Sequence, residues 1–137
     1  MKYDISALGN ALVDTQYMVD HDFLDEIGLE ADSMTLASAE EHSPIIDKLE
    51  SMGVESVSDC GGSATNSLVA ASYYGSKCHH VCRVANDEDG KKYLESLQKA
   101  GVQHIGYSKE DSEMPTGKCL IFVTPDAKRT MSSMLGI

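Results

Sequence analysis

The sequence predicts an α/β protein in which a parallel sheet flanked by helices carries a small accessory sheet. Strands alternate with helices through the middle of the chain, whereas its two ends contain hairpin-like strand pairs. Of the 137 residues, 42% are hydrophobic and 24% are charged, which is typical of a folded globular protein. Neither an internal repeat nor a low-complexity linker divides the chain.

The first half of the chain is predicted to contain short strands and two helices. A buried strand stops at the pair Gly9-Asn10, and extended chain follows it. A brief helix ends at Gly28. Ser38 and Glu41 have the spacing of a capping box, which predicts the start of an amphipathic helix. The elements expected here are strands over 3–8, 11–19 and 33–37 and helices over 21–27 and 39–52.

The second half is predicted to alternate strands and helices and then to end in two strands. Glycines at 75 and 101 mark the ends of its two helices. The turn Thr124-Pro-Asp-Ala127 joins the last two strands. The chain stops directly after a strand, without a polar tail, which we expect of a chain cut within a fold. The elements expected here are strands over 54–60, 78–84, 103–108, 118–124 and 128–134 and helices over 63–74 and 87–100.

The charge balance limits the classes of partner. Aspartate and glutamate outnumber lysine and arginine by 22 to 11, and the net charge is −11. Because such a field repels phosphate backbones and anionic lipids, we expect no nucleic-acid or membrane partner, although a local site for a small phosphorylated ligand stays open. The absence of a signal-peptide core and of any 18-residue apolar run predicts a cytoplasmic protein with reduced cysteines.

The most informative segment is GGSATNSLVAASYYG, in which a glycine pair leads directly into a helical pattern. Glycines allow close approach of a ligand to the backbone, and the first turn of a helix has free N–H groups. Ser63, Thr65 and Asn66 add short polar side chains at this junction. The combination favours a pocket for a polar small molecule. The alternative is an ordinary glycine turn with Ser63 as the N-cap residue.

Asn10 and Asp14 are candidate ligands for the vicinal hydroxyl groups of a sugar. A carboxylate accepts two hydrogen bonds at once, and an asparagine side chain both donates and accepts. The alternative is that Asn10 only fills a left-handed turn position and that Asp14 is merely exposed. Arg129 offers a planar fork that suits a phosphate, against the simpler interpretation of a solvated surface arginine.

Several other chemistries are not supported. In the segment CHHVC, Cys78 and Cys82 would lie about 13 Å apart along a strand. Two sulfur atoms on one zinc ion lie no more than about 4.6 Å apart, so we expect buried thiols and no metal site. The chain has no GxGxxG, GxxxxGK[ST] or GxSxG motif, which argues against dinucleotide binding, P-loop hydrolysis and serine hydrolysis.

Taken in order, five segments resemble the PfkB (ribokinase-like) family of sugar and nucleoside kinases: GNALVD, SMTLAS, GGSATNSLVAASYYG, RVANDEDGKKYLESLQKAGV and PTGKCLIFVTPDAKRTMSSMLG. The resemblance implies a ribokinase-like fold, with a parallel Rossmann-like sheet flanked by helices and a small β-sheet lid. Residues 1–137 would form the N-terminal part of one such domain, truncated at the C-terminus. The lid strands would cover approximately 11–19, 33–37 and 107–134.

The resemblance also implies roles for particular residues. Those that would contact the acceptor are Asn10, Asp14, Gly62, Ser63 and Asn66, the first two through the sugar hydroxyls. Arg129 resembles an arginine that approaches the transferred phosphate in some members. The lid would close over the sugar and could form a homodimer interface. GNALVD and TPDAKRTM favour the adenosine-kinase-like side of the family, and adenosine, ribose, fructose and other sugars all stay open as acceptors.

Family chemistry would transfer the γ-phosphate of ATP to a primary hydroxyl, with an aspartate base and Mg²⁺ at the phosphates. The DTxGAGD-like block that supplies the base does not occur in residues 1–137. We therefore expect no catalytic residue before Ile137, ATP and Mg²⁺ bound mainly by a missing C-terminal half, and no activity of the isolated chain. The alternatives are a stand-alone, non-enzymatic module that binds a sugar or nucleoside, and a Rossmann-type cofactor domain, against which the missing fingerprint argues.

Overall fold

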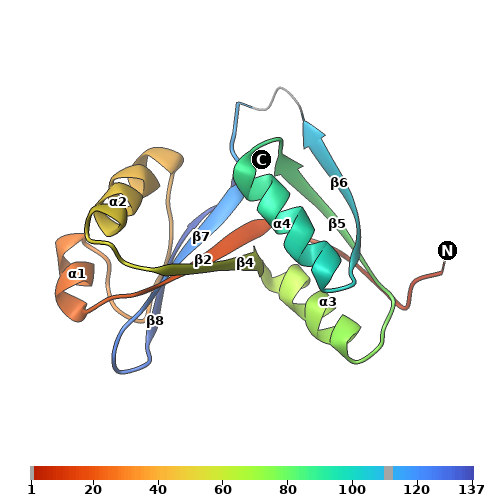
Figure 1. Ribbon diagram of the computed structural model, residues 1–137, viewed down its shortest axis with the longest axis horizontal. Helices are drawn as coiled ribbons and strands as arrows, with labels where there is room; N and C mark the ends of the chain where they lie inside the picture. Colours follow the sequence, from red (N-terminus) through yellow and green to blue (C-terminus); the bar gives the residue numbers. More distant parts are fainter. Residues whose placement is uncertain (1, 110–112) are drawn as a thin grey trace. The chain divides into compact units, whose positions relative to one another are not determined.

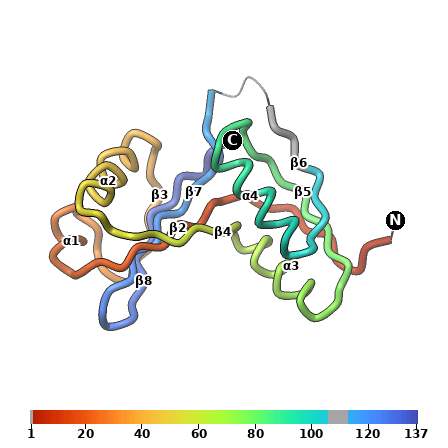
Figure 2. The backbone as a smooth tube through the Cα atoms, viewed as in Figure 1, coloured from red at the N-terminus to blue at the C-terminus, as the bar shows by residue number. Residues whose placement is uncertain are grey.

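The computed structural model describes residues 2–109 and 113–137, with the side chains of 106–109 left out (Figure 1). The chain forms two compact units, each of which is described by itself. The first comprises Met1–Asp14, Asp59–Lys118 and Leu135–Ile137, and the second comprises Thr15–Ser58 and Cys119–Met134. The chain therefore passes from the first unit to the second and back twice, a path that can be followed in Figure 2.

The elements of the described residues agree with those expected from the sequence to within two residues at each end. Capping explains two of the helix starts, because Asp87 accepts a hydrogen bond from the Gly90 N–H and Ser38 forms the expected capping box with Glu41. In chain order they are β1 (Ile5–Leu8), β2 (Leu12–Met18), α1 (His21–Glu26), β3 (Met34–Leu36), α2 (Ala39–Ser51), β4 (Ser56–Gly61), α3 (Ser63–Tyr73), β5 (Cys78–Ala85), α4 (Glu88–Lys99), β6 (Gln103–Lys109), β7 (Gly117–Val123) and β8 (Arg129–Met134).

The first unit contains the predicted parallel sheet, with strand order β1-β5-β6. Helix α3 contacts β1 and β5, and helix α4 contacts β5 and β6, so both helices cover one face of this sheet (Figure 1). Alternate residues of β5 point into the core beneath them. The buried members of this core are Ala11, Val13, Cys60, Leu68, Cys78, Cys82, Val84, Tyr93, Leu97 and Val102.

The opposite face of the parallel sheet carries a row of exposed apolar side chains. Leu8 pairs with Val81, and Val81 pairs with Ile105, so the three side chains lie side by side across the three strands. Their exposed fractions are 81%, 38% and 53%. Parallel sheets are normally covered on both faces, so this row is an unusual surface for a folded unit.

The second unit holds most of a five-stranded sheet with order β3-β8-β7-β2-β4, together with α1 and α2 (Figure 2). Its core forms around Phe122, whose ring centroid lies 5.8 Å from that of Phe23 and 6.2 Å from that of Tyr17. The other buried members are Leu24, Leu49 and Leu120. This sheet corresponds to the accessory sheet predicted from the ends of the sequence.

The composition of the two sheets differs in two places from the expected lid strands over 11–19, 33–37 and 107–134. Strand β4 belongs to the five-stranded sheet beside β2, whereas residues 107–109 belong to β6 in the parallel sheet. Residues 107–109 belong to the parallel sheet because β6 pairs with β5 from His79 opposite Gln103 to Ala85 opposite Lys109. Residues 110–112 of the expected lid segment lie outside the described residues.

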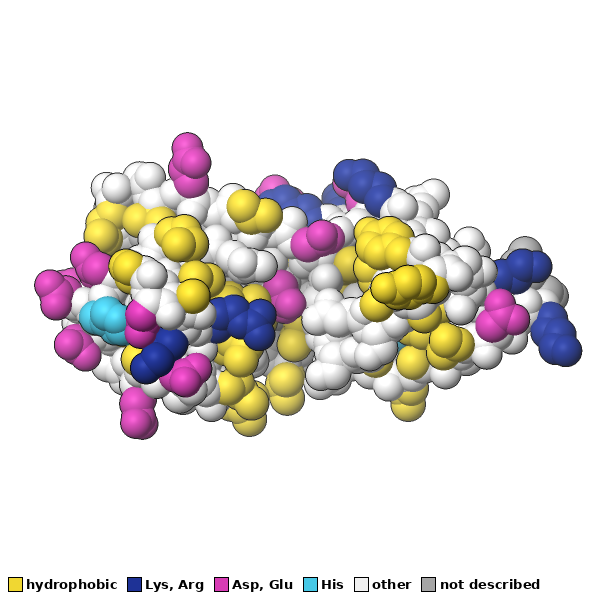
Figure 3. All heavy atoms as spheres, turned by 90° about the horizontal axis from the view of Figure 1, so that it is seen from below, with side chains coloured by type: hydrophobic (Ala, Val, Ile, Leu, Met, Phe, Trp, Pro, Cys, Tyr) yellow, Lys and Arg dark blue, Asp and Glu magenta, His cyan; other side chains and the backbone are white. Residues whose placement is uncertain are grey.

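The surface is mixed in character. On the face drawn in Figure 3, acidic and basic side chains are spread widely and hydrophobic side chains lie exposed between them. Within the described part of the chain, no helix has the length and apolar character needed to cross a membrane.

Candidate functional site

The predicted site residues of the first unit lie on two segments that meet. The first segment follows β1, runs through Gly9-Asn10 and enters β2 as far as Asp14. The second is the end of β4, the glycine pair and the first turn of α3. Both segments come together because β1 packs against α3, and because Gly62, between β4 and α3, has a positive φ that favours glycine.

Asp14 and Gly61 form the closest approach between the two segments. Gly61 is buried, and a β-carbon at this position would overlap with Cγ and both carboxylate oxygens of Asp14. The carboxylate therefore lies directly over the backbone of the first glycine. Only the absence of a side chain at Gly61 makes this arrangement sterically possible.

Asn10 and Gly62 form the second approach. Gly62 has φ +99°, in the region that favours glycine, and a β-carbon there would lie 2.6 Å from the backbone oxygen of Asn10. Gly62 is also the N-cap residue of α3, and within the described residues no side chain caps this helix. The alternative interpretation of Ser63 as the N-cap is thus wrong, because Ser63 is the first residue of the helix itself.

The first turn of α3 presents its polar residues to solvent. Ser63 and Asn66 are both exposed and lie three residues apart, on one side of the helix. Asn10 is exposed as well, and Asp14 is half-buried. The structure therefore brings five predicted residues to one accessible helix start. Hydroxyl groups of a ligand could donate to the carboxylate, and the N-terminal N–H groups favour electronegative atoms.

Arg129 belongs to the second unit, where it is the exposed first residue of β8. Its expected role at a phosphate therefore stays a prediction.

The sequence analysis did not predict a buried hydrogen-bond chain between the first turn of α3, α4 and β5. Thr65 Oγ1 lies 2.8 Å from Tyr93 Oη, which lies 3.1 Å from His80 Nδ1. All three side chains are fully buried. The helical spacing of Thr65 with Leu68 was the available signal for an inward-facing threonine. Nothing local marks Tyr93 or His80 as its partners, which lie on α4 and β5.

The cysteines are structural. All four are buried free thiols, and burial raises the pKa of Cys60, Cys78 and Cys82, which makes them poor nucleophiles. Cys78, His80 and Cys82 share the buried face of β5. Among the described residues, no group of three or more His, Cys, Asp or Glu side chains is placed to hold a metal ion.

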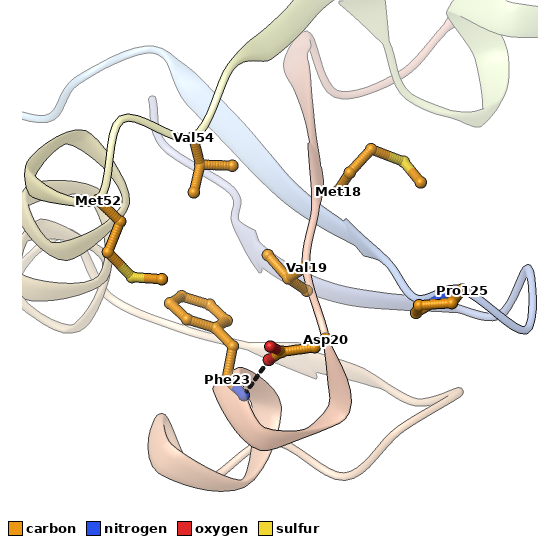
Figure 4. Close-up of a pocket in the computed structure, with 7 residues that line it drawn as sticks. All are labelled: Met18, Val19, Asp20, Phe23, Met52, Val54 and Pro125. Carbon is orange, nitrogen blue, oxygen red and sulfur yellow. Dashed lines mark hydrogen bonds between the residues drawn. The ribbon is translucent and has the colours of Figure 1, made fainter.

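Among its described residues, the second unit contains a smaller and a larger cavity, and the predicted site residues line neither of them. The smaller, of about 280 Å³, is almost entirely apolar (Figure 4). Asp20 at its edge is occupied as the N-cap of α1, since it accepts a hydrogen bond of 2.8 Å from the Phe23 N–H. The larger, of about 750 Å³, lies along α2 and includes Lys48, which forms an ion pair with Glu26.

Comparison with known proteins decides the family. The family model described as pfkB family carbohydrate kinase matches residues 34–136, about three quarters of the chain. The chain belongs to the pfkB family. Its ribokinase-like α/β fold, predicted from the resemblance, is thereby confirmed.

Individual relatives of the pfkB chain agree with this assignment. Adenosine kinase 1 from Arabidopsis thaliana is 30% identical over 120 residues, which are 85% of this chain and 33% of that protein. A probable sugar kinase from Rhizobium etli CFN 42 superimposes with a TM-score of 0.85 and 27% identity, over 98% of this chain and 39% of that one. Adenosine kinase from Sinorhizobium meliloti superimposes with a TM-score of 0.83 and 28% identity, over 99% of this chain and 40% of that one. The chain thus spans about a third of the length of the curated relative.

Proposed function

We propose that this pfkB chain carries the acceptor-binding site of an ATP-dependent sugar or nucleoside kinase. The observation that supports the proposal is the packing of the Asn10–Asp14 segment against the glycine pair at the start of α3. Family membership supplies the reaction class, and this cluster supplies the groups that would recognise a polyhydroxylated acceptor.

In this proposal Asp14 accepts hydrogen bonds from two adjacent hydroxyl groups of the acceptor. Asn10 and Asn66 add side-chain amides that both donate and accept, and Gly62 and Ser63 offer backbone groups at the helix start. These contacts orient a primary hydroxyl for attack on the γ-phosphate of ATP. We assign binding and orientation to these residues, and we assign proton removal to a base that they do not include.

We propose a nucleoside as the preferred acceptor, with adenosine the first to test. Two of the relatives described above are named adenosine kinases, whereas the third is named a probable sugar kinase. Ribose and fructose are therefore the comparison ligands. Arg129 stays in the proposal as a phosphate contact that a complete enzyme would use.

The reaction proposed for the complete enzyme requires ATP and Mg²⁺. Among the described residues, no group of three or more His, Cys, Asp or Glu side chains is placed to hold a metal ion, and the proposal derives no step through Mg²⁺ from these residues. We propose that ATP and Mg²⁺ bind mainly outside the 137 residues, because the DTxGAGD-like block does not occur within them.

The proposal is tested by titrating ¹⁵N-labelled chain with adenosine, ribose, fructose and NAD, and following amide chemical shifts. We expect saturable shifts at residues 9–14 and 61–66 with one of the first three ligands. Asp14→Asn should weaken that binding about 10- to 100-fold, because it removes a charged hydrogen-bond acceptor. Asp47→Asn, at an exposed acid on α2 in the second unit, is the matched control and should bind as the wild type does.

Shifts confined to other residues, or equal losses in Asp14→Asn and Asp47→Asn, would contradict the proposed site. A parallel assay with ATP and Mg²⁺ measures phosphorylation of the bound acceptor by the 137-residue chain. Turnover would contradict our assignment of binding alone. Binding of NAD in place of the acceptors would favour the cofactor-domain alternative.

A further inference from the structure

The hydrogen-bond chain Thr65–Tyr93–His80 joins three elements of the first unit. Thr65 is in the first turn of α3, Tyr93 is in the middle of α4 and His80 is on β5. Their atoms lie 2.8 Å and 3.1 Å apart, and all three side chains are fully buried. A polar chain in the centre of an apolar core is costly unless each member finds a partner, so its geometry constrains all three elements.

Both ends of this chain lie beside the backbone that carries the predicted acceptor ligands. At one end, Thr65 Oγ1 lies 3.5 Å from where a β-carbon on Gly62 would be. At the other end, His80 Nε2 lies 3.8 Å from where a β-carbon on Gly9 would be. The same position on Gly9 is only 2.7 Å from the β-carbon of Ala64, so Gly9 is packed between α3 and His80.

One nitrogen atom of this hydrogen-bond chain has no hydrogen-bond partner among the described residues. His80 Nε2 is buried and makes no hydrogen bond to any described residue. Buried ring nitrogens are normally paired, and this one lies beside Gly9.

We propose that Thr65, Tyr93 and His80 are positioning residues, which hold the segment at 9–10 and the glycine pair in the mutual arrangement that the acceptor requires. The network acts through the backbone of Gly9 and Gly62 and does not touch the acceptor. Its link to an acceptor rests on the proposed function, whereas its effect on the two segments does not.

The central test is amide hydrogen exchange of the 137-residue chain without ligand. Thr65→Val removes the hydroxyl and keeps the shape of the side chain, whereas Thr65→Ser restores the hydroxyl. We expect exchange at residues 9–10 and 62–66 to become about tenfold faster in Thr65→Val and to return toward the wild-type rate in Thr65→Ser. Tyr93→Phe should resemble Thr65→Val.

Ser72→Ala is the matched control on the same helix. Its hydroxyl donates to the carbonyl oxygens of Val69 and Ala100, both at 2.7 Å, far along α3 from the glycine pair. If the network only contributed to the overall stability of the protein, Thr65→Val and Ser72→Ala would accelerate exchange of the same amides to the same extent under conditions that give both variants the same free energy of unfolding. That result, or unchanged exchange at 9–10 and 62–66 in Thr65→Val, would overturn the proposal.

A second measurement titrates each variant with adenosine and ribose. If the wild type binds either, we expect Thr65→Val to bind about tenfold more weakly and Thr65→Ser to recover most of the affinity. Equal affinities of Thr65→Val and wild type would overturn the link between network and acceptor. If the wild type binds neither ligand, the proposed function fails, and the exchange measurement alone decides the positioning role.

Discussion

The carboxylate of Asp14 lies directly on the α-carbon of Gly61, in a space that a β-carbon at position 61 would occupy. The two residues come from different strands and are far apart in the chain. Their contact joins the segment after β1 to the glycine pair before α3, and it determines where the carboxylate lies relative to the first turn of α3. It also explains why the first glycine of the pair is needed, although sequence reasoning placed only Gly62 in the site.

Gly61→Ala should destabilise the first unit, because the added methyl group forces Asp14 or the backbone to move. We expect a loss of about 1–3 kcal/mol in the free energy of unfolding, measured by urea denaturation. The double variant Gly61→Ala/Asp14→Ala removes the overlapping carboxylate. It should be more stable than Gly61→Ala alone, and strictly additive effects would contradict the contact.

Asp87→Ala should cost more stability than an ordinary helix cap. Besides capping α4 through the Gly90 N–H at 2.7 Å, Asp87 accepts hydrogen bonds from the backbone N–H and the hydroxyl of Thr116, at 2.8 and 2.7 Å. We expect a loss of about 2–4 kcal/mol in urea unfolding. Asp20→Ala is the matched control, since Asp20 caps α1 through one local hydrogen bond, and it should cost about 1 kcal/mol.

The pKa of Asp87 also predicts a loss of folding stability at low pH. Burial favours the protonated carboxyl, but the hydrogen bonds from Thr116 and Gly90 outweigh this and lower its pKa below the usual 3.8. The folded state therefore holds the proton more weakly than the unfolded state. The stabilising contribution is complete above about pH 4 and is lost as pH falls below that value. Asp87→Asn should remove this part of the pH dependence, and an unchanged acid transition would contradict it.

His80 predicts a second pH dependence, at higher pH. Burial lowers its pKa below the usual 6.5, and the neighbouring His104 and His79 lower it further. Near pH 6.5 the unfolded chain binds a proton at this side chain that the folded chain does not bind. The contribution of His80 to the free energy of unfolding is therefore fully present above that pH and declines as pH falls below it. Unfolding measured between pH 7.5 and 5 should show this slope in the wild type. His80→Gln should flatten it, whereas the same slope in both proteins would exclude His80 as its source.

The apolar row on the outer face of the parallel sheet predicts self-association of the chain. Val81→Lys places a charge at the centre of the row formed by Leu8, Val81 and Ile105. We expect sedimentation velocity to show concentration-dependent association of the wild type, which Val81→Lys weakens.

Met18→Lys, at an exposed residue of the apolar cavity in Figure 4, tests the expected homodimer through the lid. Loss of association only in Met18→Lys would favour the lid and contradict the role of the row.

The sequence by itself determined the order and nature of the elements. The turn glycines and the Ser38–Glu41 capping box are local signals, and each element that they mark occurs within two residues of its expected position. The resemblance to the PfkB family also implied that Asn10, Asp14, Gly62, Ser63 and Asn66 would contact one acceptor.

Only the tertiary structure decided which elements are neighbours. Strand β4 joins the five-stranded sheet, and β6 continues alongside β5 through residues expected in the lid. The hydrogen bonds of Tyr93 reach Thr65 and His80, 28 and 13 residues away in the chain. Such partners are chosen by the packing of whole elements and by the need to pair each buried polar group. Local propensity and periodicity carry no information about either choice.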